Sequence, residues 1–237
     1  MKILAIDSSA KAASVAINED GKILGEFFIN VKLDHSQTLM PMVSSLLKNT
    51  FINIKYIDFF AVAAGPGSFT GVRIGVAAIK GMALANNKPC VSVSALEAMS
   101  YNFIHNDCIV CSTMDARRDQ VYNAIFEINN KKIKRLTSDR AISIESLINE
   151  LKSYEKKQVF LVGDGADLCY NDIDSAKSFI NLSPENLKYQ KASGVSFIAE
   201  TKIKNGETCS AETLMPLYLR LPQAQRELNK KTRLTTL

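Results

Sequence analysis

Short apolar and alternating blocks open the chain. Residues 3–6 form an apolar run, residues 13–17 alternate with a period of two, and Asp20-Gly21 precedes a third block at 23–31. Such alternation is typical of strands, and an Asp-Gly pair is typical of a hairpin turn. The pattern therefore predicts three strands joined by tight turns. A Rossmann fold opens instead with a strand, a glycine-rich loop and a helix, so this opening argues against it.

The period then changes to that of a helix. Apolar residues recur at helical spacing between His35 and Lys48 and predict a helix there. The elements that follow are a buried strand, a helix, a second strand and a second helix, over residues 59–64, 68–86, 90–93 and from Ser94 onward. Residues 1–104 are therefore predicted to form a first lobe with the order βββαβαβα.

The second half has a less regular pattern. It predicts helices at 144–151 and 195–204 and strands at 109–114, 121–128, 132–136 and 159–162. We expect these elements to form a smaller C-terminal lobe over residues 105–222, whose last helix can pack on the first lobe. Residues 223–237 are polar and basic and are predicted to be a tail.

Composition narrows the class of protein. The 237 residues carry a formal net charge of +5, which is compatible with a nucleic-acid neighbour but lacks a concentrated basic footprint. No apolar run approaches the roughly 20 residues that span a bilayer, so no membrane association is expected. A charge follows the first apolar run at once, and the five cysteines are scattered through apolar segments. These features predict a cytoplasmic protein with reduced thiols.

Few residues offer catalytic chemistry. The two histidines are His35 and His105, and the residue four positions after His35 is Leu39, so no helical metal pair is formed. Cys108 and Cys111 are spaced as C-x-x-C, but they lie in a predicted strand, where they point to opposite faces. No G-x-S-x-G motif occurs. The sequence predicts no catalytic residue and no metal site.

The strongest local signal is the glycine-rich block at 65–75. Gly65-Pro66-Gly67-Ser68 follows a buried strand and opens a helix, a geometry that attracts anions. Inside the helix, glycine costs about 1 kcal/mol relative to alanine, yet Gly71, Gly75 and Gly81 all occur. Either the helix packs closely on its own sheet or it meets a helix of a partner chain. Both explanations remain open at this point.

The first hairpin bears on nucleotide binding. Actin-like and sugar-kinase-like folds place Asp-x-Gly there, and the glycine lets the turn wrap a phosphate. Here the segment reads Asp7-Ser8-Ser9, and the side chain of Ser9 is expected to crowd that approach. No cofactor is therefore expected to bind to the isolated chain. The residues that remain as candidates for nucleotide binding are Asp7, Ser8, Ser9, Gly65, Gly67 and Ser68.

Two charged segments have alternative explanations. Asp115 to Asp119 forms a polar corner in which Arg117 and Arg118 either bind phosphate or form salt bridges within the lobe, and salt bridges are favoured. Residues 131–135 alternate like a solvated edge strand. Asp7 together with Asp115 or Asp164 is the one carboxylate set that a magnesium-dependent kinase could use.

Six segments together resemble one family. They are residues 4–9, 35–41, 65–75, 114–118, 163–165 and 216–220. They resemble the TsaB (YeaZ) family, long labelled glycoprotease homologues, and the likeness runs from residue 2 to about 226. It implies an α/β fold of the ASKHA class (actin/Hsp70/sugar-kinase-like, RNase H-like), with two lobes of which the second is reduced.

The resemblance also implies a role. TsaB-like proteins support the transfer of threonylcarbamoyl to N6 of adenosine 37 in tRNAs that read ANN codons. They dimerise with the catalytic paralogue TsaD, which carries a metal-binding H-x-x-x-H, and the ATPase TsaE joins them. This chain would then be a non-catalytic scaffold, while ATP or ADP and the metal ion belong to the partner subunits. It would meet tRNA through the complex, with direct contact by the basic tail as a lesser alternative.

The family contact is made by two helices of the first lobe, and the same surface can form a homodimer. The expected interface residues are His35, Ser36, Met40, Gly71, Val72, Gly75, Val76, Ile79 and Met82. The alternative function is an autonomous ATPase or kinase of the same fold class, or a metallopeptidase.

Overall fold

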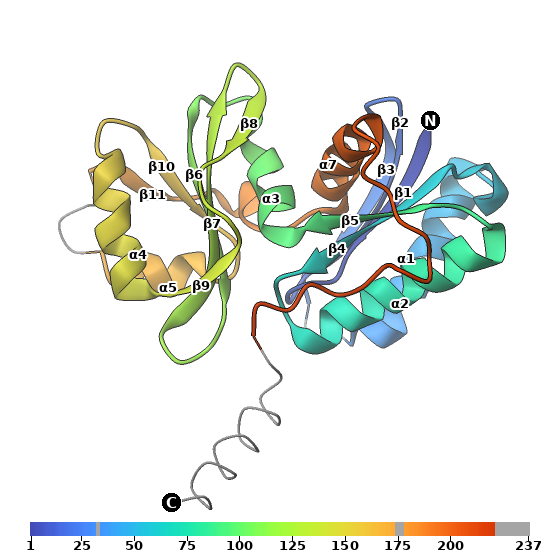
Figure 1. Cartoon of the computed structure of the whole chain (residues 1–237), viewed down its shortest axis with the longest axis horizontal. Coiled ribbons are helices and arrows are strands. Elements are labelled where there is room, and N and C mark those ends of the chain that lie inside the picture. Colours follow the sequence, from blue (N-terminus) through green and yellow to red (C-terminus); the bar gives the residue numbers. More distant parts are fainter. Residues whose placement is uncertain (32–33, 174–177, 221–237) are drawn as a thin grey trace, which may run out of the picture.

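The computed structural model describes residues 1–31, 34–173 and 178–220. Two sheets lie side by side, each with helices on its faces (Figure 1). In the first sheet the order is β3-β2-β1-β4-β5. Its strands are β1 (Lys2–Asp7), β2 (Ala13–Glu19), β3 (Lys22–Ile29), β4 (Phe59–Gly65) and β5 (Cys90–Ser94). Strands β1 to β3 form an antiparallel meander, and β4 and β5 join β1 in parallel.

Helices cover both faces of this sheet. The apolar side chains of β1 point alternately to the two faces, as the pleat of a strand requires. Leu4 and Ile6 pack with α1 (His35–Thr50) and α2 (Phe69–Asn86), whereas Ile3 and Ala5 pack with α7 (Ala192–Lys204). The first lobe is therefore a three-layer α/β/α sandwich with two apolar cores.

The second sheet has the order β11-β10-β6-β7-β8, with β9 paired to β7. Its strands are β6 (Cys108–Asp115), β7 (Gln120–Asn129), β8 (Lys132–Arg135), β9 (Arg140–Ser143), β10 (Val159–Val162) and β11 (Ile180–Leu182). The helices of this half are α4 (Ile144–Leu151), α5 (Ala166–Asn171) and α6 (Glu185–Lys188). Helix α3 (Ala95–Ser100) follows β5 and connects the two halves, and single 3-10 turns lie at Ile54–Tyr56, Tyr101–Phe103 and Lys152–Tyr154. Helix α3 lies between the two sheets in Figure 1.

The two sheets repeat one topology. In the second sheet, β6 pairs antiparallel with β7 and parallel with β10, and β11 adds a further parallel strand. In the first sheet, β1 likewise pairs antiparallel with β2 and parallel with β4, and β5 adds a further parallel strand. Asp7 and Asp115 end the two equivalent central strands. The repeat exists in the backbone alone, because the sequence shows no repeat at a fixed period.

The predicted order βββαβαβα matches the observed elements of the first lobe. The second half departs from the prediction in the short elements β9, β11, α5 and α6, which were missed. Helix α7 begins at Ala192 and packs on the strands of the first sheet. The predicted tail, 223–237, lies outside the described residues. Within the described residues, no helix has the length and apolar character needed to cross a membrane.

After α7 the chain runs alongside α2 and the edge of the first sheet. We call residues 208–220 the strap; it crosses in front of α2 in Figure 1. Lys80 on α2 donates from Nζ to two strap carbonyls, those of Glu212 and Leu214, at 3.1 Å each. At the far end, Arg220 donates to the carbonyl oxygen of Ala116 at 2.7 Å. The strap therefore begins on the first sheet and ends on the second.

Candidate functional site

The turn after β1 packs directly on the glycine-rich loop after β4. The backbone N–H of Ser68 donates to the carbonyl oxygen of Ser9 at 2.6 Å. A Cβ atom at Gly67 would lie less than 3.0 Å from that same oxygen. The main chain of the turn thus fills the space in front of Gly67, where the sequence suggested an anion site. Ser68 also accepts from the N–H of Gly71 at 3.3 Å and caps α2.

Asp7 lies at the end of β1 and is fully buried. Its Oδ1 accepts from the N–H of Ser9 at 2.9 Å and from the Ser9 hydroxyl at 2.6 Å. Its Oδ2 is buried and has no hydrogen-bond partner among the described residues. Burial raises the pKa of Asp7 to about 6, although the two bonds from Ser9 oppose that rise.

The side chain of Ser9 is held within its own hairpin, because its hydroxyl donates to Asp7. The expectation that this side chain crowds a phosphate stays a prediction. The atom that meets Gly67 is the carbonyl oxygen of Ser9. Ser8 is held as well, since its hydroxyl donates to the carbonyl oxygen of Gly71 at 2.9 Å.

His35 joins this arrangement from the first residue of α1. Its Nε2 donates to the carbonyl oxygen of Ala10 at 2.7 Å, so the ring ties α1 to the first hairpin. His105 lies on an exposed turn before β6. Among the described residues, no group of three or more His, Cys, Asp or Glu side chains could hold a metal ion. Asp7, Asp115 and Asp164 therefore belong to no such group, and the pairing of Asp7 with Asp115 or Asp164 stays a prediction.

The glycines Gly71 and Gly75 face their own chain. A Cβ atom at Gly71 would lie less than 3.0 Å from the carbonyl oxygen of Ser8, and one at Gly75 would lie 2.5 Å from the Ser8 hydroxyl. Close packing of α2 on its own hairpin thus accounts for both residues.

This packing corrects the interface prediction. Six of its nine residues are buried within the chain, where the apolar side of α2 packs on the sheet: Gly71, Val72, Gly75, Val76, Ile79 and Met82. These six cannot form an exposed partner surface. His35 is half-buried, and Ser36 and Met40 are exposed. For these last three, the interface assignment stays a prediction.

The equivalent corner of the second lobe is also closed by its own groups. The N–H of Asp115 donates to Oδ1 of Asp164 at 3.2 Å, and burial raises the pKa of Asp164. A Cβ atom at Gly163 would lie less than 3.0 Å from the carbonyl oxygen of Thr113. Arg117 forms a salt bridge of 3.4 Å with Asp115, in line with the favoured explanation for this segment.

Two further sequence interpretations are confirmed. Cys108 and Cys111 lie on β6 and point into different apolar cores, so they do not form a redox pair. Burial raises the pKa of the Cys108 thiol to about 11. Residues Lys132–Arg135 form β8 at the edge of the second sheet, where Arg135 pairs with Glu97 at 2.6 Å.

The outward side of α2 carries a feature that the sequence analysis did not separate from Gly71 and Gly75. Gly81 is exposed, and a Cβ atom there would have no heavy atom within 4 Å. Ala77, Leu84 and Ala85 are exposed on the same side of the helix, and Leu84 is 65% exposed. We call these four residues the α2 stripe. The sequence contains a sign of this stripe. At helical spacing, position 81 falls on a different side of the helix from the apolar positions and from 71 and 75.

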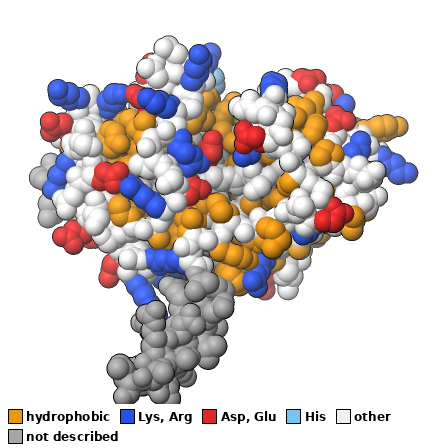
Figure 2. All heavy atoms as spheres, viewed as in Figure 1, with side chains coloured by type: hydrophobic (Ala, Val, Ile, Leu, Met, Phe, Trp, Pro, Cys, Tyr) orange, Lys and Arg blue, Asp and Glu red, His pale blue; other side chains and the backbone are white. Residues whose placement is uncertain are grey.

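Further apolar side chains are exposed on α1 and on the strap. Figure 2 shows hydrophobic side chains gathered over the lower middle of the view, where α2 and the strap lie. Met215 of the strap is 66% exposed, and Met40 of α1 is 45% exposed. Two cations border the stripe and are already engaged: Lys80 binds strap carbonyls, and Arg73 donates to the Tyr218 hydroxyl at 2.6 Å. The stripe is thus apolar, with these two cations at its border.

Comparison with known proteins identifies close relatives. Residues 22–228 match the family model of TsaD, tRNA N6-adenosine threonylcarbamoyltransferase. The chain is 31% identical to the tRNA threonylcarbamoyladenosine biosynthesis protein TsaB of Bacillus subtilis, over 95% of this chain and 96% of that protein. It is 30% identical to TsaB of Escherichia coli, over 98% and 100%. The solved structure of YeaZ from Pseudomonas aeruginosa superposes with a TM-score of 0.80 at 26% identity, covering 92% and 99% of the two chains. The predicted two-lobed α/β fold of the ASKHA class is confirmed.

Proposed function

The chain belongs to the TsaB family of tRNA threonylcarbamoyladenosine biosynthesis proteins, and we propose that it acts there as a non-catalytic subunit that supports a catalytic relative of the TsaD type. One observation carries the proposal most directly: the backbone of the first hairpin occupies the space in front of Gly67. A phosphate group would have to displace the Ser9 carbonyl and break its bond from Ser68. The ATP or ADP and the metal ion of the reaction then belong to the partner subunits.

The α2 stripe supports the second half of the proposal. A glycine in the exposed middle of a helix destabilises the helix by about 1 kcal/mol, and none of the described residues needs the absence of a side chain at Gly81. A backbone from another chain can approach closely at such a position. The neighbouring Ala77 and Leu84 are apolar and exposed, which suits burial against an apolar helix of the partner.

We therefore assign the partner surface to α1 and α2, as the family resemblance implied, but to the outward side of α2. TsaD is the proposed direct partner, and TsaE joins the pair. The complex would transfer threonylcarbamoyl to N6 of adenosine 37 in tRNAs that read ANN codons. In the absence of TsaD, the same apolar surface supports a homodimer.

Gly81→Arg tests the interface, because it fills an open position and improves helix propensity, so the isolated chain stays folded. Co-elution with TsaD in size-exclusion chromatography should weaken by at least about tenfold. Asn149→Arg is the matched control, since it adds the same side chain to an exposed helix position of the second lobe. It should leave co-elution unchanged. Equal co-elution of both variants would contradict the assigned surface.

The non-catalytic role is tested by reconstitution. Transfer to tRNA should require this chain together with TsaD, TsaE and a source of threonylcarbamoyl-adenylate. Full transfer in its absence would overturn the scaffold role. Low-micromolar binding of Mg·ATP to the isolated chain by calorimetry would instead support the autonomous ATPase or kinase, and metal-dependent peptide cleavage by the isolated chain would support the peptidase.

A further inference from the structure

Two cysteines face each other where the strap begins. Cys90 opens β5, and Cys209 lies opposite it in an isolated antiparallel bridge. The N–H of Cys90 donates to the carbonyl oxygen of Cys209 at 2.8 Å, and the N–H of Cys209 donates to the carbonyl oxygen of Cys90 at 2.9 Å. Both thiols are free. We propose that Cys90 and Cys209 form a reversible disulfide that staples the strap to the edge of the first sheet.

The bridge geometry supports the bond. Residues that exchange both backbone hydrogen bonds across an antiparallel pair have Cα atoms about 5.5 Å apart. Disulfides join Cα atoms separated by roughly 4.4–6.8 Å. Directly opposite residues also point to the same side of the ladder, and here both side chains pack with the core between α2 and the sheet. The thiol of Cys209 already donates to the carbonyl oxygen of Cys90 at 3.6 Å.

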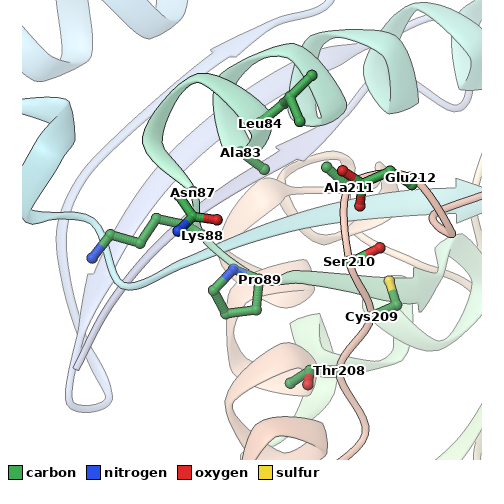
Figure 3. A pocket seen from close by; sticks show the side chains of 10 residues that line it. All are labelled: Ala83, Leu84, Asn87, Lys88, Pro89, Thr208, Cys209, Ser210, Ala211 and Glu212. Atoms are coloured by element: carbon green, nitrogen blue, oxygen red, sulfur yellow. The ribbon is translucent and has the colours of Figure 1, made fainter.

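An oxidant can reach one of the two thiols. Of the five cysteines, all within the described residues, four are buried and Cys209 is partly exposed. Figure 3 shows the Cys209 sulfur over β5, in a groove between the C-terminal end of α2 and the strap. Leu84, Lys88 and Glu212 also line this groove. Cys209 is therefore the thiol that reacts first, and buried Cys90 resolves the intermediate.

The chemistry balances with an external disulfide as the oxidant, for which glutathione disulfide serves as the probe. The Cys209 thiolate attacks one glutathione sulfur, and the other glutathione leaves as a thiol. The Cys90 thiolate then attacks the Cys209 sulfur and displaces the second glutathione. Two protein thiols are oxidised, one glutathione disulfide is reduced to two thiols, and the two thiol protons end on glutathione. Burial raises the pKa of the Cys90 thiol to about 11, so the second step accelerates with rising pH.

The staple would act on the edge of the α2 stripe. In the reduced chain, two backbone hydrogen bonds hold the start of the strap on β5. The Cβ atoms of such a pair lie about 5 Å apart, roughly 1 Å more than in a relaxed disulfide. The strap must close slightly to make the bond, so the bond is readily reduced again. This inference does not depend on the proposed function.

The test uses the full chain and glutathione disulfide at about pH 8.5. Intact mass should show the loss of two hydrogens with no glutathione retained, and peptide mapping should join residues 90 and 209. The two cysteines are 119 positions apart, so the midpoint of thermal unfolding should rise by roughly 5 °C and return when a dithiol is added.

Three variants sharpen the result. Cys90→Ser should stop at one stable glutathione on Cys209, and Cys209→Ser should take up none. Cys108→Ser is the matched control and should form the disulfide as the unaltered chain does. The proposal is overturned if the unaltered chain keeps glutathione on Cys209, stays unmodified, or joins a different pair or two copies of the chain.

Discussion

Alanine substitutions at the three glycines of α2 should change the free energy of unfolding with different signs. All three replacements improve helix propensity by about the same amount, roughly 1 kcal/mol. What differs is the space that each Cβ atom would enter. At Gly81 that space is open, at Gly75 it holds the Ser8 hydroxyl, and at Gly71 it holds the Ser8 main chain.

The structure sets the size of each effect. Gly81→Ala should stabilise the chain by about 1 kcal/mol, because the new methyl group meets nothing. At Gly75 the hydroxyl 2.5 Å away can rotate, but Ser8 then loses its hydrogen bond to the carbonyl of Gly71, about 1 kcal/mol, and the net change is near zero. Gly71→Ala must move backbone, and overpacking of about 3 kcal/mol leaves a net loss of about 2 kcal/mol.

The free energies of unfolding of the three variants are measured by urea unfolding, followed by far-ultraviolet circular dichroism. The slope of the free energy against urea concentration checks that each variant exposes the same surface on unfolding. The expected order of stability is Gly81→Ala first, then the unaltered chain with Gly75→Ala, and Gly71→Ala last. The three variants control for one another, because residue type and helix are the same. A Gly71→Ala variant as stable as Gly81→Ala would refute the packing of the hairpin on α2.

Three further predictions follow from the same corner and the strap. Burial raises the pKa of Asp7 from 3.8 to about 6, so the stabilising contribution of its protonated form is full below about pH 4 and is lost as pH rises through 6. Urea titrations of the unaltered chain from pH 4 to 7 should therefore show a decline of about 3 kcal/mol in the free energy of unfolding, and Asp7→Asn should remove that decline. An unchanged pH profile in the variant would contradict the assignment. Ser68→Ala should cost about 1 kcal/mol in thermal unfolding through loss of the α2 cap, whereas an unchanged midpoint would show that the cap is dispensable. Arg73→Ala removes the hydrogen bond to Tyr218 of the strap and a contact of 3.7 Å with the Phe69 ring. Limited proteolysis should then cut the strap several-fold faster, and an equal rate of cleavage would show that Arg73 does not hold the strap in place.

Local pattern predicted the elements that are long or bounded by clear turns. The Asp20-Gly21 turn and the periods on either side of it predicted the first meander, which pairs as expected. Strand β9 was missed although it is as long as β8 and β10, because its place depends on pairing with β7. The same holds for β11, whose three residues pair with β10.

The candidate site was harder to predict, because Gly71 and Gly75 are both explained by a residue remote in the chain. Ser8 lies 63 positions before Gly71, and no local pattern could bring them together. The sequence correctly identified α2 and its glycines as unusual, yet assigned the apolar, sheet-facing side of the helix to a partner. Gly81 was within reach of sequence reasoning, since its helical phase differs from that of Gly71.

The contact between the Ser9 carbonyl and Gly67 has an evolutionary consequence. Every amino acid has a main-chain carbonyl, so a change of side chain at position 9, to glycine included, would leave that oxygen where it is. Reopening the space in front of Gly67 would require a turn of different length or path. Point substitution alone therefore offers no short route to an open space in front of Gly67, because backbone shape closes that space rather than any one side chain.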